Sequence, residues 1–355
     1  MDRRAFLKTA AGVTGGTVLA GCLEPLGFET QSAWRDPPLV ENRPDAVYYP
    51  SIVEGMGMYG TTTAGDVGFA LMHSFPHRFW TLTGDDRTKV VVTDTDSLHL
   101  MASVWDTQTG AVLPLDVSLE LSMEDGTTRT TNLWPMVSPN MGFHYGDNID
   151  LPSEGRYEAT LQVGGLQANR ARGFENRVTS SRKATIPFTF DTRETYELEY
   201  RRLSEKAGTP GTVGLMEMGM VPKPVAPLVD ELPGRLLGAP SSGDAELPTT
   251  LVSAGNPFTE SGQPYLLVSP RTPYNRVMLP NMGLSATITR DGERFIEESL
   301  QATLDSDIGH HYGVPVPELQ PGDTITVTVN APPQLARHDG YETAFMNMPP
   351  VELTY

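Results

Sequence analysis

Histidine and methionine are the residue types best able to do chemistry in this sequence, which holds seven histidines, fifteen methionines and one cysteine. Neutral imidazole and thioether groups suit copper, and the thioether favours Cu(I). His99 and Met101 alternate along a predicted strand, so their side chains point to the same face. Met136 lies on a later predicted strand, and His144 follows after a loop. These residues form a candidate copper site, although a methionine-lined core with hydrogen-bonded histidines explains the same spacing.

The segment around these residues resembles a known family. Trp134-Pro135-Met136-Val137, followed by a loop and His144-Tyr145-Gly146-Asp147-Asn148-Ile149, is similar to two runs of the periplasmic iron-transport-associated copper-binding family. Those runs read Met-Pro-Met-Val and His-Tyr-Gly-Ala-Asn-Ile. The resemblance covers residues 90–190. It implies an immunoglobulin-like sandwich that binds copper and takes part in iron uptake, without hydrolytic or transfer activity.

The same resemblance assigns roles to single residues. Met136 matches the family's methionine ligand, while His144 and His99 match two of its histidine ligands. Met101 stands where the family has a glutamate that tunes the metal site. The family's further histidine has no counterpart in residues 169–172. Replacing an oxygen ligand by a thioether and losing an imidazole shifts the preference toward Cu(I) or abolishes tight binding. Copper and iron are thus the implied ions.

The chain also repeats itself. His310-His311-Tyr312-Gly313 lies 167 residues after Phe143-His144-Tyr145-Gly146, and Arg290-Asp291-Gly292 lies 166 residues after Glu124-Asp125-Gly126. A nearly constant displacement indicates two copies of one fold. We call residues 46–200 the first repeat and residues 212–355 the second.

The second repeat keeps few of the candidate ligands. Tyr265 stands at the position of His99, but His338 appears where the first repeat has Ala171. One hypothesis is that the repeats pack as an intrachain pseudo-dimer, in which His338 joins the ligands of the first repeat. The alternative is a second repeat that serves structure only, with exposed histidines such as His310.

A further group combines methionines and histidines near the start of the first repeat. It comprises Met56, Met58, Met72, His73 and His77. If residues 52–58 pair with residues 68–73 as strands, Met58 comes close to Met72 or His73. Glycine between methionines on a strand favours close backbone approach as readily as metal binding.

The patterns of the rest of the body predict an all-β fold. Short apolar or alternating runs recur, for example at residues 98–104 and 157–163, and no stretch sustains a helical period. Asp125-Gly126 and Glu154-Gly155 suit hairpin turns between such runs. Strands at this spacing are typical of a sandwich. We therefore expect two tandem immunoglobulin-like β-sandwiches, joined near residues 195–212.

The N-terminus predicts export and lipid attachment. Arg3-Arg4 precedes a short apolar stretch and Leu19-Ala20-Gly21-Cys22, which reads as a twin-arginine lipoprotein signal over residues 1–21. Cys22 is the only cysteine and stands where lipid is attached. Proline-rich residues 22–45 then form a flexible tether. We expect the protein on the extracytoplasmic face of the cell membrane, anchored through lipid on Cys22.

Composition and absent motifs exclude several function classes. The net charge of −18 disfavours nucleic-acid binding. Acidic, lysine-poor composition together with the signal resembles haloarchaeal lipoproteins. The sequence has no nucleophile elbow, zincin helix, phosphate-binding loop or dinucleotide fingerprint, so no enzyme is predicted.

Three functions remain in competition. The leading hypothesis is a lipid-anchored protein that binds copper or iron and serves an iron permease, which requires His99, Met136 and His144 to converge. The second is a metal-free surface module that binds another protein. It predicts dispersed histidines and an exposed patch, for example around Phe75, Phe79 and Trp80. A third is an oxidoreductase that uses the same metal.

Overall fold

Strands make up almost all the regular structure of this chain. The computed structural model describes residues 37–259 and 262–355, which contain one short α-helix, α2 (Thr192–Tyr196), and one 3-10 helix, η1 (Val229–Glu231). The expected fold class, all-β with tandem immunoglobulin-like sandwiches, is confirmed. No helix in the described part is long and apolar enough to cross a membrane. The predicted signal peptide and Cys22 lie outside the described residues.

The first sheet assembly is drawn mainly from the first repeat. Its main path runs β12-β10-β7-β8-β9-β6-β3-β2, while β4, β5 and β23 attach beside it. The strands are β2 (Gly57–Ala64), β3 (Val67–Ser74), β4 (Phe79–Thr83), β5 (Asp86–Val90), β6 (Leu98–Asp106), β7 (Val117–Met123), β8 (Thr128–Ser138), β9 (Gly142–Ile149), β10 (Gly155–Val163), β12 (Arg182–Phe190) and β23 (Ala336–Arg337). Residues 128–133 of β8 pair with β7 and residues 134–138 pair with β9, so this long strand joins the two layers.

The second sheet assembly repeats this plan. Its main path runs β14-β17-β18-β21-β20-β19-β22-β24, and β11 attaches to β20. The strands are β11 (Asn169–Arg170), β14 (Arg235–Gly238), β17 (Thr249–Val252), β18 (Tyr265–Val268), β19 (Gly283–Arg290), β20 (Glu293–Asp305), β21 (Gly309–Pro315), β22 (Thr324–Ala331) and β24 (Val351–Thr354). Two small antiparallel pairs complete the fold, β1 (Ile52–Glu54) with β13 (Tyr200–Arg202) and β15 (Ser241–Ser242) with β16 (Ala245–Glu246).

Burial patterns explain which strands lie at the centre. Buried and solvent-facing residues alternate along β12, as expected of a strand with one face on the core. All residues of β3 and β6 are buried, because these strands are covered on both faces. Gly126, at φ 84°, makes the predicted hairpin turn between β7 and β8. The hairpin predicted at Glu154-Gly155 is wrong, because β9 pairs with β6 and β8 while β10 pairs with β7 and β12, so the chain crosses between layers there.

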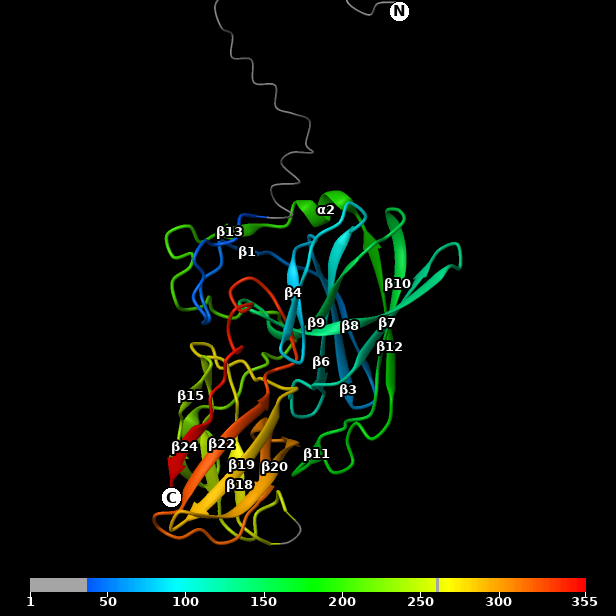
Figure 1. Cartoon of the computed structure of the whole chain (residues 1–355). Coiled ribbons are helices and arrows are strands. Elements are labelled where there is room, and N and C mark those ends of the chain that lie inside the picture. Colours follow the sequence, from blue (N-terminus) through cyan, green and yellow to red (C-terminus); the bar gives the residue numbers. More distant parts are fainter. Residues whose placement is uncertain (1–36, 260–261) are drawn as a thin grey trace, which may run out of the picture.

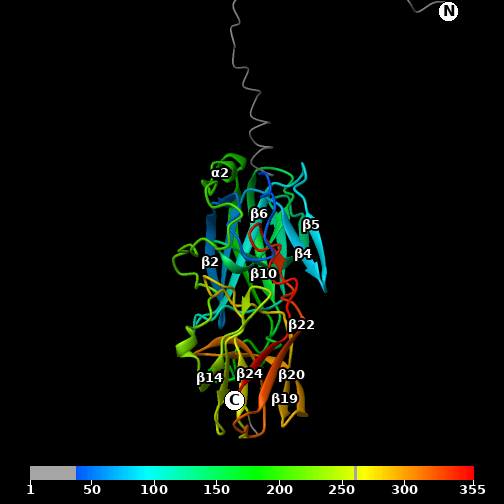
Figure 2. The same ribbon diagram turned by 60° about the vertical axis from the view of Figure 1, so that its left-hand side comes forward.

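The two assemblies exchange short segments. β23, from the second repeat, runs parallel to β8 of the first, with Ala336 opposite Met136. β11, from the first repeat, runs parallel to β20 of the second, with Asn169 opposite Thr303. Figure 1 shows the first assembly above the second, and Figure 2 shows the same stacking after a rotation. In Figure 1 the chain between β22 and β24 turns up toward β4, while β11 lies beside β20. The repeat boundaries at 46–200 and 212–355 stay a prediction.

Candidate metal centre

Three neighbouring strands place three of the predicted ligands on one face of the first assembly. Met136 on β8 lies directly opposite His144 on β9, so their side chains share a face. His99 on β6 lies opposite Asn148, which is on the same face of β9 as His144 because alternate residues of a strand point the same way. Gly146 lies between His144 and Asn148 on that face. A Cβ at Gly146 would stand 2.9 Å from His99 Nε2 and 3.2 Å from Met136 Sδ, so the glycine leaves room for both ligands.

Two further histidines close over this face from different directions. His338 follows β23, and its backbone N–H donates to the Val137 carbonyl at 3.1 Å. His77 precedes β4, which pairs with β23 through Trp80 and Arg337. One ring nitrogen of His338, Nδ1, lies 3.0 Å from His77 Nε2, and the other, Nε2, lies 3.4 Å from Met136 Sδ. The ring centroid of His144 lies 5.2 Å from that of His338.

We call this group the metal centre. It consists of His77, His99, Met136, His144 and His338. Potential ligand atoms of His77, His99 and His338 lie within 4.8 Å of one another. Its members are nearly inaccessible to solvent, with exposed fractions of 0% for His99 and Met136 and 1% for His144. His77 and His338 retain 5% and 6%.

Hydrogen bonds fix which ring nitrogen of three histidines faces inward. Nδ1 of His77 and of His144 each lies 3.0 Å from a backbone carbonyl oxygen, of Phe75 and Gly142 respectively. His99 Nδ1 lies 2.9 Å from Asn148 Oδ1, and the amide nitrogen of Asn148 donates to the His77 carbonyl at 2.9 Å. Because these oxygens only accept, each Nδ1 carries the proton and each Nε2 presents a lone pair. Histidines that bind metals are commonly oriented in this way.

The inward nitrogens support a metal more strongly than the spacing alone. His99 Nε2 and His144 Nε2 are buried and have no hydrogen-bond partner among the described residues. A buried polar atom left without a partner costs about 1–3 kcal/mol. A metal ion that accepts these lone pairs removes that cost. The residues therefore fit a copper ion, whose preferred donors in proteins include imidazole and thioether.

Burial keeps the imidazoles neutral. It lowers the pKa of His77 and of His144 to about 4, the Phe75 and Gly142 carbonyls opposing the shift. The pKa values of His99 and His338 lie well below the usual range, mainly through burial and further through neighbouring histidines. Since only the neutral ring can bind a metal, the centre is ready to do so at neutral pH.

Ion pairs anchor the segment that carries His338. Arg78 donates two hydrogen bonds to Asp339, at 3.2 and 2.7 Å, and the two side chains are 4% and 14% exposed. These residues directly follow His77 and His338 in the chain, so the pair joins the two segments that close the centre. Nearby, Glu342 accepts hydrogen bonds from the side chains of Tyr48 and Arg43.

The remaining sequence-predicted residues fall into separate places. Met101 is 3% exposed and lines a small cavity that His77 and His338 also line, so it lies beside the centre. His73 is buried and stacks on Tyr59 at 4.1 Å. His310 and His311 are buried in the second assembly, so the expectation of exposed histidines there is wrong.

His77 is the functional residue that the sequence did not single out. The sequence grouped it with Met56, Met58, Met72 and His73 rather than with the metal ligands. No spacing links it to His99 or His338, because the connection before β4 alone brings it over the sheet. Among those grouped residues, the predicted pairing of Met58 with Met72 is present in β2 and β3.

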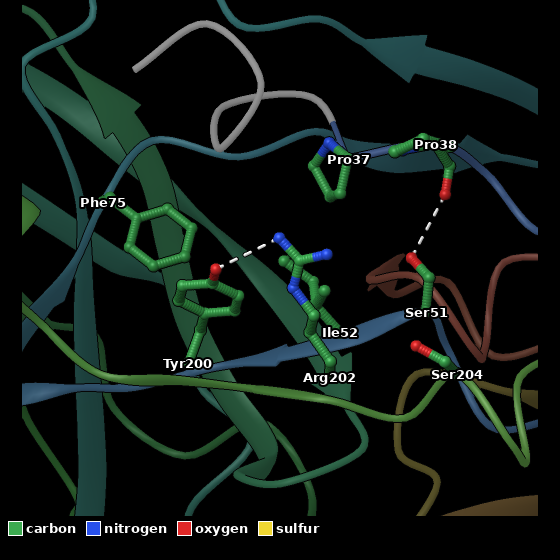
Figure 3. Close-up of a pocket in the computed structure, with 8 residues that line it drawn as sticks. All are labelled: Pro37, Pro38, Ser51, Ile52, Phe75, Tyr200, Arg202 and Ser204. Atoms are coloured by element: carbon green, nitrogen blue, oxygen red, sulfur yellow. Dashed lines mark hydrogen bonds between the residues drawn. The ribbon is translucent and has the colours of Figure 1, made fainter. Parts of the chain in front are cut away.

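Another pocket lies near the start of the described chain, and it shares no lining residue with the metal centre. It is lined by Pro37, Pro38, Ser51, Ile52, Phe75, Tyr200, Arg202 and Ser204. Figure 3 shows Tyr200 and Arg202 side by side, joined by a hydrogen bond. None of its lining side chains is a histidine, methionine, cysteine or carboxylate. This pocket therefore offers none of the side chains that usually bind metals, and it is not a second candidate metal site.

Comparisons with known proteins divide the chain into two matched parts. Residues 94–201 match a family described as Fe2+ transport protein, and residues 230–354 match a domain of unknown function, DUF7350. His99, Met136 and His144 fall in the first match and His338 in the second. His77 falls in neither. No curated protein matches the chain.

Solved structures with a similar fold include two copper-bound proteins. One is a copper-bound variant of FetP from uropathogenic Escherichia coli strain F11, with 19% identity, 38% of this chain and 97% of that chain covered, and a TM-score of 0.29. The other is a copper-bound variant of P19 from Campylobacter jejuni, with 20% identity, coverage of 38% and 97%, and a TM-score of 0.30. The chain is therefore similar to an Fe2+ transport family over residues 94–201.

Proposed function

We propose that this protein binds copper at the metal centre, outside the cytoplasm, and serves iron uptake without being an enzyme. The observation that carries the proposal is the convergence of four neutral imidazoles and one thioether in a buried site. Two of the inward ring nitrogens, on His99 and His144, have no other partner among the described residues. In the second repeat the Nε2 atom of His311 is also buried without a partner among the described residues, so the proposal depends on the convergence of several donors and not on one unpaired nitrogen.

The donor set favours copper over iron as the resident ion. The centre offers nitrogen and sulfur atoms, and its described ligand group contains no carboxylate. Thioether and imidazole together suit copper, and the thioether of Met136 favours Cu(I). Iron enters the proposal as the transported ion, because residues 94–201 match the Fe2+ transport family. The copper bound by the similar FetP and P19 variants agrees with this choice.

The anchoring and assembly of the protein complete the proposal. The sequence of residues 1–22 supports twin-arginine export and a lipid on Cys22, which holds the protein at the extracytoplasmic face beside an iron permease. The reciprocal exchange of β11 and β23 supports an intrachain pseudo-dimer in which the second repeat supplies His338.

The alternative of a metal-free interaction module is less well supported. It predicts dispersed histidines and an exposed aromatic patch. Phe75, Phe79 and Trp80 are instead buried, with exposed fractions of 1%, 0% and 6%.

Metal titration tests the proposal. We would purify the full chain carrying Cys22→Ser, which removes the only thiol and the lipid, and titrate it with Cu(I), Cu(II) and Fe(II). We expect one Cu(I) per chain, and binding weakened by more than about 100-fold in His99→Ala or His338→Ala, since even outer partners of a metal site contribute about 10–100-fold. Circular dichroism checks that each variant folds. Failure of the folded parent chain to bind any of the three ions contradicts the proposal.

A further inference from the structure

A small cavity adjoins the metal centre on one side. His77 and His338 of the centre line it together with Met101 and Met141, and all four residues are buried. Glu54 and Met56 line it as well, and both are half-buried. The lining thus extends from two partly exposed residues to two members of the centre.

The solvent exposure of the five members of the centre is greatest on the side of this cavity. His99, Met136 and His144 are at most 1% exposed, whereas His77 and His338 keep 5% and 6%. The two members with the most residual exposure are also the two that line the cavity. An ion that reaches the centre without large rearrangement therefore arrives from the cavity.

The cavity lining offers both sulfur and oxygen atoms. Met56, Met101 and Met141 contribute three thioether groups, two of them on buried residues, and Glu54, Ser74, Ser138 and Asn140 contribute side-chain oxygens. Thioethers bind Cu(I) and have little affinity for harder ions such as Fe(II). Methionine side chains are also flexible, so they can follow an ion over a short distance. Packing of Met56 against the hydrophobic core explains its partial burial, but not its place in the lining of a cavity that two histidines of the centre also line.

We propose that this cavity is the access route for Cu(I), with Met56 at the outer end and Met101 at the inner end as transient ligands. The ion passes from thioether to the imidazoles of His77 and His338 by ligand exchange, with no electron transferred. This inference rests on the proposed copper-binding function. It adds the oxidation state that is admitted and the residues that admit it.

Transfer kinetics test the inference on the full chain carrying Cys22→Ser. Cu(I) is supplied as its complex with a chromophoric chelator, and loss of the complex is followed by stopped flow. We expect Met56→Leu to slow loading by about tenfold, the low end of what outer groups contribute to metal sites. The equilibrium affinity should stay unchanged, because leucine conserves the volume and the centre is intact. Met58→Leu is the matched control, since Met58 lies two residues further along the chain, on β2, but is 41% exposed and does not line the cavity.

The outcomes separate this inference from the proposed function. If Met56→Leu loads as fast as the parent while His99→Ala loses affinity, the access route is wrong and the metal centre stands. If Met56→Leu loses affinity in proportion to rate, Met56 is a resident ligand and the route is equally wrong. If the folded parent binds no Cu(I), the proposed function itself fails.

Discussion

The two repeats present the same framework with different side chains. Met136 lies opposite His144 in β8 and β9, and Thr303 lies opposite His311 in β20 and β21. The ring Nδ1 of His144 and of His311 contacts the carbonyl two residues before it, at 3.0 and 3.3 Å. In both rings Nε2 is buried without a partner among the described residues. The framework alone therefore orients one imidazole in each repeat.

The residues around this histidine differ between the two repeats. In the second repeat Tyr265 takes the position of His99, and its hydroxyl lies 3.2 Å from Thr303 Oγ1. Ala171 follows β11, the segment exchanged into the second assembly, and its N–H donates to the Leu304 carbonyl. The N–H of His338 donates to the Val137 carbonyl in the same way. Phe258 packs its ring against Tyr265 and His311, at 5.0 and 5.2 Å between centroids. The proposed metal binding therefore depends on a few side chains and not on the strand pairing, which both repeats share.

The largest expected effect comes from removing the same histidine in each repeat. His144→Ala should weaken Cu(I) binding by more than about 100-fold, because it removes an inward Nε2 from the centre. His311→Ala, at the equivalent register position, should leave the affinity unchanged. Competition against a chromophoric Cu(I) chelator measures both. Equal losses in the two variants would place the ion between the repeats and contradict the comparison.

A smaller effect should follow from the ion pair that joins the segments of His77 and His338. Arg78→Ala leaves Asp339, which is 14% exposed, without its partner, so the loss of folding stability should lie below the roughly 3–5 kcal/mol that a fully buried pair costs. It should also weaken Cu(I) binding by about 10–100-fold, because the histidines lose their fixed positions. Urea unfolding and chelator competition measure the two effects.

Its matched control lies on the other exchanged segment. Arg172 pairs with Asp305 at 3.2 Å, and the two side chains are 47% and 0% exposed. Arg172→Ala leaves the buried Asp305 without this partner, so it should also lower the folding stability, but it should leave copper affinity unaltered because the pair does not touch the metal centre. If Arg78→Ala also leaves copper affinity unaltered, the Arg78–Asp339 pair has no positioning role.

Acid sensitivity should be shared by both repeats when no metal is bound. Burial lowers the pKa of His144 and His311 to about 4, so the unfolded chain, with pKa about 6.5, binds more protons between these values. Stability is thus highest above pH 6.5 and falls as the pH drops toward 4, by about 3 kcal/mol for each such histidine. Burial also raises the pKa of four acids, of Glu54 to about 7, of Asp147 to about 6, and of Asp244 and Glu342, which opposes the trend. All seven histidines have lowered pKa values, so we expect the histidines to outweigh these four acids.

Urea unfolding between pH 4 and 7 checks this expectation. His144→Gln and His311→Gln should each flatten the dependence of stability on pH by a similar amount. Added Cu(I) should raise the stability of His311→Gln but not that of His144→Gln, since only the first variant keeps the metal centre. A pH dependence that neither substitution alters would show that other groups control acid unfolding.

The sequence predicted the members of the candidate site that depend on local strand pattern and missed the member, His77, that depends on the path of the chain. Alternation placed His99 on the correct face, and the resemblance identified Met136 and His144. Comparison of the repeats then suggested His338 through its match to Ala171. The sequence could not reveal His77, because its position follows from the connection into β4 and not from any periodicity. The crossing at Glu154-Gly155 was likewise hidden, since the same dipeptide suits a hairpin.

The smallest effect should come from building a metal site into the second repeat, at the position equivalent to the metal centre. The second repeat lacks three of the candidate ligands. The triple substitution Tyr265→His, Thr303→Met and Ala171→His supplies counterparts of His99, Met136 and His338. We expect a second Cu(I) to bind, more weakly than the first, because Phe258 packs on His311 and no counterpart of His77 is supplied. Chelator competition gives the stoichiometry, and the same triple variant with His144→Ala isolates the new site. If it binds a single Cu(I) and loses that ion with His144→Ala, the exchanged segments do not hold ligands in equivalent positions. A second bound ion would mean that the framework common to both repeats is sufficient, and that the first repeat binds copper because of the residues it carries.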